Sequence, residues 1–232
     1  MSKTVEVLIG KMPVTIYGEN SEKVLIYVHG QSGRANEVER FADVIENKGF
    51  QILAVNLPKH GERNDDTEFV PWLVVPELKL VSEYVKIHWQ RFVICATSIG
   101  VWFSLFAFND IGADKFLFFS PLVDMENMID NLMTAACVTE ARLKKEKVVE
   151  TEFGQTLSIE YLNWVRNNPV TFVSGRTSIL YAENDTVIPF FTVKAFADKY
   201  KCKLSVMNSG EHWFHTKPQI LHLKTWLYDE LN

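Results

Sequence analysis

The sequence predicts an α/β domain in which helices cover both faces of a mostly parallel sheet. Short apolar runs rich in β-branched and aromatic residues recur along the chain, and longer segments of helical period separate them. The chain has 232 residues, of which 47% are hydrophobic, so it can bury a large core. Because α/β sheets of this size occur as single units, we expect one domain over residues 1–232.

Six apolar runs are expected to form the parallel strands. They are Val24–Val28, Gln51–Val55, Phe92–Ala96, Phe116–Phe119, Ser178–Ala182 and Leu204–Met207. Ahead of them, Val5–Ile9 and Val14–Tyr17 are separated only by Gly10 and Lys11, a spacing that predicts a hairpin. The expected sheet therefore has eight strands and begins with an N-terminal hairpin.

Segments of helical period lie between these strands. The expected helices are Asn36–Lys48, Glu77–His88, Ile99–Asn109, Phe191–Tyr200 and Pro218–Leu231. Gly49 follows the first of them, as is common where a helix ends.

The alternation of strands and helices is interrupted between Ser120 and Thr177. Met125–Met133, Val138–Lys147 and Ser158–Asn167 have helical character, and Val148–Phe153 is compatible with a short strand or hairpin arm. A long connection of this kind predicts a small cap-like insertion at about residues 121–176. The alternative is a surface excursion that touches no ligand.

Composition excludes several classes of protein. The formal net charge of −5 argues against nucleic acid or an anionic membrane as a partner. The chain has no run of eighteen apolar residues, and Met1–Glu6 lacks the apolar core of a signal peptide, so a cytoplasmic location is expected. Two of the three cysteines, Cys95 and Cys202, lie in apolar strand-like runs, where a thiol behaves as a small hydrophobe. Neither a disulfide framework nor a metal site is predicted.

Ser98 is the most informative residue. It ends an apolar run where a helical pattern begins, and Ala96 and Gly100 flank it two positions away on either side. A sharp strand-to-helix turn with small flanking residues is typical of the G-x-S-x-G nucleophile turn, here with alanine at the first position. The alternative is that Ser98 is merely a small residue at a tight turn.

Three further junctions carry chemistry, because ligands of open α/β sheets bind at the carboxyl ends of the strands. His29–Gly33 reads H-G-x-x-G and follows the strand expected at Val24–Val28. Asp185 lies in E-N-D-x-x-I-P after the strand expected at Ser178–Ala182, and His212 lies in G-E-H-W-F after the last expected strand.

With these four motifs in this order, the chain resembles the α/β-hydrolase superfamily, whose triads run serine, aspartate, histidine. It is similar to the small bacterial serine esterases and thioesterase-like hydrolases, and Leu57–Arg63 resembles the His-Gly loop after their fourth strand. The resemblance covers nearly the whole chain. It implies the α/β-hydrolase fold and a reaction that needs no cofactor.

The residue types suit acyl transfer. Histidine can take the proton of a serine hydroxyl and return it to the leaving group, and a buried aspartate can orient the imidazole. We therefore expect Ser98 as nucleophile, His212 as base and Asp185 as its partner. The family arrangement further implies an oxyanion hole made by the backbone N–H groups of Gln31 and Ile99.

Each assignment has a competitor. His215 also follows the last expected strand, and Glu183 and Asn184 lie beside Asp185, which could alternatively cap the helix after Pro189. His29 is expected to brace its loop. His60 and Arg63 are expected to be solvated loop residues, with contact to a charged end of the substrate as the alternative.

The expected activity is hydrolysis of a carboxylic ester or thioester, so the expected partner is a small-molecule acyl compound. An aminopeptidase or acyl-peptide-hydrolase-like amide hydrolase and a non-catalytic binding or sensor protein are the alternatives. Four apolar side chains are candidates for the substrate pocket, with core packing as the alternative: Trp102, Met125, Met128 and Trp213. A monomer or a homodimer is expected, since an exposed edge strand could support a dimer.

Overall fold

The computed structural model describes residues 3–171 and 176–232. The described residues form two compact units: one contains the chain up to Val123 and from Arg176 onward, and the other is Asp124–Thr171. The second unit lies within the insertion expected at residues 121–176, of which 172–175 are outside the described residues. That this unit caps the sheet stays a prediction.

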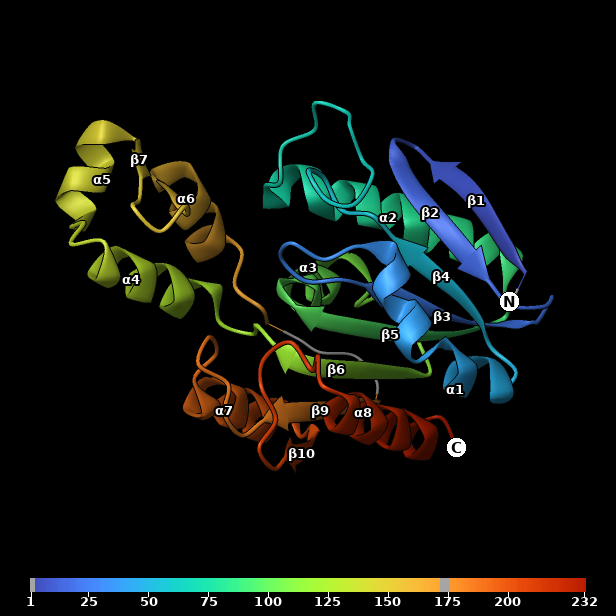
Figure 1. The fold of residues 1–232 in the computed structure, drawn as a ribbon. Helices are drawn as coiled ribbons and strands as arrows, with labels where there is room; N and C mark the ends of the chain where they lie inside the picture. Colours follow the sequence, from blue (N-terminus) through green and yellow to red (C-terminus); the bar gives the residue numbers. More distant parts are fainter. Residues whose placement is uncertain (1–2, 172–175) are drawn as a thin grey trace. The chain divides into compact units, whose positions relative to one another are not determined.

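The first unit contains an eight-stranded sheet in the order β1-β2-β4-β3-β5-β6-β9-β10 (Figure 1). The strands are β1 (Thr4–Ile9), β2 (Met12–Tyr17), β3 (Lys23–Val28), β4 (Gln51–Val55), β5 (Arg91–Ser98), β6 (Lys115–Pro121), β9 (Arg176–Ala182) and β10 (Lys203–Met207). From β4 to β10 all neighbours are parallel, and β2 pairs antiparallel with both β1 and β4. All eight predicted strands are confirmed.

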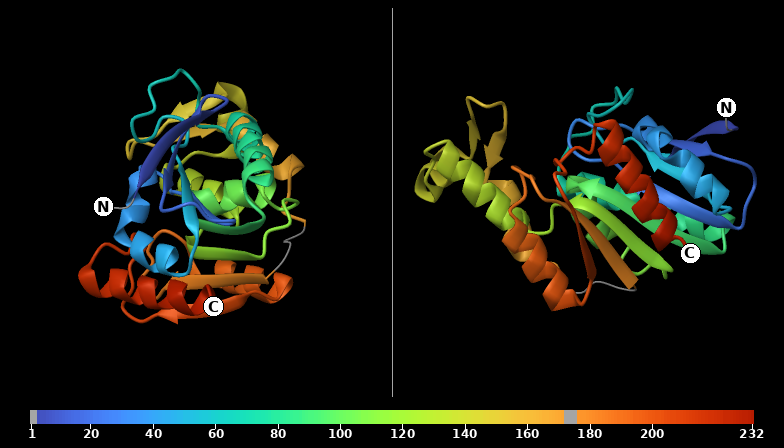
Figure 2. Two further views of the ribbon diagram at one scale, coloured as in Figure 1. Left: turned by 90° about the vertical axis from the view of Figure 1, so that its right-hand side faces the viewer. Right: turned by 60° about the horizontal axis from the view of Figure 1, so that its bottom comes forward.

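Helices cover both faces of this sheet. The helical elements of the first unit are η1 (Ala35–Arg40), α1 (Ala42–Asn47), α2 (Pro71–His88), α3 (Ile99–Ala107), α7 (Phe190–Tyr200) and α8 (Lys217–Glu230). Helices α1 and α8 lie side by side on one face (Figure 2), where Ile45 and Leu223 join a core with the strand residues Leu25 and Leu117. Helices α2 and α3 pack against each other on the opposite face (Figure 1).

Two predicted helix boundaries are wrong. The helix expected at Asn36–Lys48 is a 3-10 helix and a short α-helix, separated at Phe41, whose φ of −140° is not helical. The helix expected to begin at Glu77 begins at Pro71 and continues through Pro76. Proline is favoured at the first helical position, where its missing N–H has no intrahelical partner.

The second unit contains three helices and a hairpin within its described residues. These are α4 (Met125–Ala135), α5 (Glu140–Glu146), α6 (Ile159–Asn167) and the antiparallel pair β7 (Val148–Glu150) and β8 (Thr156–Ser158). Arg166 connects two of the helices, since it contacts Glu126 of α4 at 2.6 Å and Glu140 of α5 at 3.1 Å. The hairpin expected near Val148 is confirmed.

No helix in the described part of the chain combines the length and apolar character needed to cross a membrane.

Glu230 connects α8 to the amino ends of the strands. Its carboxylate accepts hydrogen bonds from Lys203 at 2.6 Å, Ser178 at 2.7 Å and Lys115 at 3.2 Å, and its side chain is 4% exposed. Burial alone would raise the pKa of Glu230, but the hydrogen bonds from these three residues outweigh it and lower the pKa below its ordinary value.

Because this pKa is lower in the folded protein, ionised Glu230 stabilises the fold above the unfolded-state pKa, and this contribution is lost as the pH falls through the folded-state pKa. We expect Glu230→Gln to lower the free energy of unfolding at pH 7 by about 1–2 kcal/mol. Urea denaturation between pH 3 and pH 7 checks this. The difference between wild type and variant should shrink at the acid end, and a difference independent of pH would contradict the assignment.

Candidate active site

Ser98 stands at the turn where β5 ends and α3 begins. Its φ of 51° and ψ of −127° lie in a region that residues other than glycine rarely adopt. Such strain persists only where the surrounding structure enforces it, and it is often found at functional sites. The turn predicted from the apolar run and the small flanking residues is therefore present, and it holds the serine in a strained conformation.

The small residues around Ser98 permit this turn. A Cβ atom on Gly100 would lie 2.4 Å from the carbonyl oxygen of His29 and 2.6 Å from that of Val28, so the first turn of α3 touches the end of β3 directly. A Cβ atom on Gly30 would lie 3.0 Å from that of Ser98. Ala96 is fully buried in β5, so its methyl group is accommodated where the usual motif has glycine.

Hydrogen bonds connect three strand ends at Ser98. The Oγ atom of Ser98 lies 3.0 Å from Nε2 of His212, and Nδ1 of His212 lies 2.7 Å from Oδ2 of Asp185. A carboxylate can only accept, so Nδ1 carries the proton and Nε2 is left to accept from the Ser98 hydroxyl. The side chains of His212 and Asp185 are 4% and 0% exposed. The structure thus brings the three predicted residues together.

Asp185 is held by its own loop. Its Oδ1 atom accepts from the backbone N–H groups of Val187 and Ile188, both at 2.8 Å, which leaves Oδ2 for His212. Helix α7 begins at Phe190 with Pro189 as its N-cap, so Asp185 does not cap it. The capping alternative considered for Asp185 is therefore excluded.

The competitors of these residues lie elsewhere. His215 is exposed, and its ring contacts Glu211 at 3.4 Å rather than Ser98. Glu183 accepts a hydrogen bond from the backbone of Ser209 at 2.7 Å, so it braces the turn that carries His212. The backbone N–H of Asn184 donates to Gly210 in that same turn.

The loop that carries His212 has a second support, which the sequence analysis missed. Gln219, at the start of α8, accepts hydrogen bonds from the backbone of His215 at 3.0 Å and of Thr216 at 3.3 Å. Its amide also donates to the carbonyl of Ser209 at 3.4 Å. The T-x-x-Q pattern of Thr216 and Gln219 is a capping-box signature and could have indicated this role.

Two backbone N–H groups are proposed for the oxyanion hole. That of Ile99 is next to Ser98 in the chain, and that of Gln31 is near Ser98 in space. Ile99 is the first residue of α3, so its N–H has no intrahelical acceptor. Gln31 follows Gly30, which abuts Ser98. In the described part of the chain, neither N–H donates to a backbone carbonyl of a turn or loop. That these groups stabilise an oxyanion stays a prediction.

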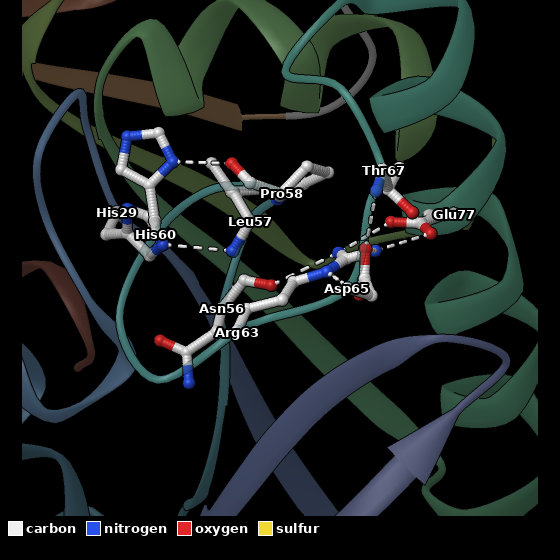
Figure 3. Close-up of polar contacts among 9 residues, drawn as sticks. All are labelled: His29, Asn56, Leu57, Pro58, His60, Arg63, Asp65, Thr67 and Glu77. Atoms are coloured by element: carbon white, nitrogen blue, oxygen red, sulfur yellow. Dashed lines mark hydrogen bonds and ion pairs between the residues drawn. The ribbon is translucent and has the colours of Figure 1, made fainter.

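The other polar candidates are committed to contacts within the protein (Figure 3). His29 is buried; its Nδ1 lies 2.8 Å from the carbonyl oxygen of Gly30, and its Nε2 accepts from the backbone of Leu57 at 3.1 Å. Burial lowers the pKa of His29 to about 3, so the ring is neutral and braces its loop as expected. The expectation that His60 is a solvated loop residue is wrong, because His60 is buried and its ring contacts the carbonyl oxygen of Pro58 at 2.7 Å.

The expectation that Arg63 is a solvated loop residue is wrong. Its side chain is 1% exposed and makes ion pairs with Asp65 at 2.5 Å and Glu77 at 2.7 Å. With these partners, the guanidinium is not free to bind a charged end of the substrate either. No local pattern predicts this contact, because Glu77 lies in α2, fourteen residues from Arg63.

The four pocket candidates lie in different surroundings. Trp213 is 63% exposed, and its ring meets that of His212 edge to face at 5.3 Å. Trp102 is 2% exposed and packs on Phe103 and Phe106, as in the core-packing alternative. Met125 and Met128 belong to α4 of the second unit. Contact of any of these four with a substrate stays a prediction.

Several residues with strained backbone conformations lie where strands end or in the loops that follow them. Six residues other than glycine with positive φ lie at the carboxyl ends of strands of the first unit or in the loops that follow them: Ser32, Lys59, Ser98, Ser120, Ser209 and Phe214. The positive φ of the five residues other than Ser98 could not be predicted from the sequence, because serine, lysine and phenylalanine do not indicate such a conformation. The edge of the sheet that bears Ser98 is therefore the strained edge.

A mostly parallel sheet with a serine on a strand-to-helix turn is the arrangement of the α/β-hydrolase fold. No protein-family model matches the chain, and no curated protein matches its sequence. Solved structures do match, and they share this fold.

Three solved structures illustrate the similarity. Est1E from Butyrivibrio proteoclasticus, with ferulic acid bound, is 16% identical with a TM-score of 0.76, over 98% of this chain and 97% of that chain. Mouse alpha/beta hydrolase domain-containing protein 10 is 12% identical with a TM-score of 0.79, over 99% and 98%. The Pyrococcus furiosus esterase Pf2001 is 15% identical with a TM-score of 0.73, over 100% and 90%. The chain has the α/β-hydrolase fold, and the fold expected from its motifs is confirmed.

The two small residues of the turn should respond differently to substitution. We expect Gly100→Ala to lower the free energy of unfolding by about 3 kcal/mol or more, because the added methyl group meets backbone carbonyls that cannot move aside. Ala96→Gly, which restores the usual motif, should cost only about 1–2 kcal/mol through lost burial and backbone entropy. Urea denaturation of both variants checks this, and equal losses would contradict the packing described.

Proposed function

We propose that this protein is a serine hydrolase that cleaves a carboxylic ester or thioester through an acyl-enzyme intermediate on Ser98. One observation carries the proposal: an unbroken chain of hydrogen bonds joins Asp185, His212 and Ser98, with the serine on a strained turn. Ser98 precedes the second unit in the chain, whereas Asp185 and His212 follow it, and each of the three comes from a different strand end. A purely structural role does not require a serine, a histidine and an aspartate in this order of contact.

The mechanism follows from the positions of the protons. His212 takes the Ser98 proton at Nε2 while Oγ attacks the substrate carbonyl, and a tetrahedral oxyanion forms. The buried Asp185 carboxylate stabilises the imidazolium that results. His212 then gives the proton to the leaving alcohol or thiol as its bond to the carbonyl carbon breaks. His212 next takes a proton from a water molecule, whose oxygen attacks the acyl carbon; it then returns that proton to Oγ of Ser98 as the ester bond to the serine breaks and the acid leaves.

Backbone donors supply the electrostatic part of catalysis. In this proposal the N–H groups of Gln31 and Ile99 bind the oxyanion, and the latter benefits from its place at the N-terminus of α3. Loss of one such donor typically costs about 10²–10³ in turnover. The reaction needs no cofactor.

Esters and thioesters are proposed ahead of amides. Pf2001, which shares the fold, is named as an esterase. The exposed ring of Trp213 stands beside His212 and offers an apolar contact to the acyl or leaving group. Turnover of matched p-nitrophenyl esters, thioesters and aminoacyl anilides tests the preference, and faster cleavage of the anilides would overturn it.

Removal of the nucleophile tests the proposal itself. Ser98→Ala should lose at least ~1,000-fold in kcat on a short p-nitrophenyl ester, because no acyl-enzyme can form. Circular dichroism should show an unchanged fold, since alanine fits the space of serine. Wild-type turnover in a folded Ser98→Ala variant would refute the assignment.

The two histidines form a matched pair. His212→Ala should lose about as much turnover as Ser98→Ala, because both residues act in one step. His215→Ala should keep wild-type turnover, since its ring is exposed and is paired with Glu211 rather than with Ser98. A large loss in His215→Ala alone would show that the assigned base is wrong.

A further inference from the structure

The segment His29–Ala35, here called the oxyanion loop, carries Gln31 between the end of β3 and the start of η1. It belongs to no strand, and its only internal backbone hydrogen bond in turns and loops is Gly33 N–H to the Gly30 carbonyl, at 3.1 Å. One hydrogen bond is little restraint for a segment that must place an N–H group to within a fraction of an ångström. Other contacts must hold it.

Two consecutive residues hold the loop at both of its ends. Asn56 and Leu57 directly follow β4. The side-chain Oδ1 of Asn56 accepts from the backbone N–H of Ala35 at 2.8 Å, and the backbone N–H of Leu57 donates to Nε2 of His29 at 3.1 Å. We call this pair of contacts the clamp.

The clamp continues to the donor itself. The other nitrogen of His29, Nδ1, donates to the carbonyl oxygen of Gly30 at 2.8 Å, so it fixes the peptide group that joins Gly30 to Gln31. That carbonyl belongs to the same peptide unit as the Gln31 N–H. Fixing its direction therefore also fixes the direction of the N–H group.

Buried charges fix the clamp in turn (Figure 3). The guanidinium of Arg63 donates a hydrogen bond to the backbone carbonyl oxygen of Asn56 at 3.5 Å. It is held by two hydrogen bonds to Glu77 of α2, at 2.7 Å and 2.8 Å. The backbone N–H of Asn56 donates to Pro13 of β2 at 3.0 Å, so both sides of the residue are anchored to regular structure.

The fit around Asn56 is close. A Cβ atom on Gly61, whose φ is +60°, has no room: it would lie 2.4 Å from Oδ1 of Asn56. The loop after β4 therefore packs closely against the side-chain amide of Asn56 and restricts its orientation.

We propose that Asn56 is a positioning residue for the oxyanion hole: its side-chain oxygen, by holding Ala35, sets the Gln31 N–H beside Ser98. The inference rests on the proposed function of Ser98. Asn56 touches neither the substrate nor the triad, so it acts through the loop, and its loss should weaken stabilisation of the transition state more than binding of the substrate.

Asn56→Leu tests the proposal, because it keeps the size of the side chain and removes the acceptor. The readout is kcat and KM on an ester and on the thionoester in which sulfur replaces the carbonyl oxygen. Sulfur is a weak hydrogen-bond acceptor, so a thionoester draws less on the oxyanion hole. We expect kcat on the ester to fall about 10²-fold with little change in KM, and kcat on the thionoester to fall far less.

Two variants serve as controls. Asn56→Asp keeps an oxygen acceptor for Ala35 and should recover most of the lost turnover. Glu68→Gln changes an exposed ion pair with Lys59 in the same loop and should behave as wild type. If Asn56→Leu does not fold by circular dichroism, Asn56→Ser, whose side chain is too short to reach Ala35, is measured on the same two substrates.

Equal losses on the ester and the thionoester, a change in KM alone, or wild-type kcat in the folded variant would each overturn the proposal. Labelling of wild-type Ser98 by a fluorophosphonate distinguishes failure of the proposed function from failure of the role proposed for Asn56. Absence of labelling refutes the proposed function. Labelling together with any of those three outcomes refutes the role of Asn56 alone.

Discussion

The close approach of α3 to the end of β3 is the constraint on which the site depends. At Gly100 a single methyl group would meet the carbonyl oxygens of Val28 and His29. Because the helix begins so near the strand, the chain must turn sharply at Ser98, and the serine takes a positive φ. The same approach brings Gly30 against Ser98, so nucleophile and oxyanion loop are placed by one packing contact.

Parallel strands extend this constraint to the other residues of the site. The carboxyl ends of β5, β9 and β10 lie at one edge of the sheet, where the loops that follow them meet. Each polar residue is then held twice: Asp185 by two backbone N–H groups as well as by His212, and the His212 loop by Glu183 and Gln219. Much of the chemistry of the site therefore depends on hydrogen bonds that never touch a substrate.

Most of the fold could be predicted from the sequence because buried parallel strands are short apolar runs. Gln51–Val55 was predicted to the residue, since the apolar run Ile52–Val55 lies between Gly49, where a helix ends, and the polar Asn56. The start of α2 could not be predicted, because Pro76 resembles a helix boundary although the helix runs through it. The triad residues were identifiable because each lies at the end of a strand or within five residues after it, inside a recognisable motif.

The supports of the site could not be predicted in the same way. Arg63 pairs with Glu77, and Asn56 with Ala35, across separations set by the fold rather than by any local period. Asn56, directly after a strand, looks like an ordinary turn residue. Only the folded chain shows that its oxygen faces Ala35.

Detection of an acyl-enzyme tests the central claim most directly. The protein is mixed with a p-nitrophenyl ester, quenched in acid within the first turnovers and analysed by peptide mass spectrometry. The account predicts that the peptide containing Ser98 gains the mass of the acyl group. Ester turnover with no acyl group on Ser98, or with the acyl group on another residue, would contradict it.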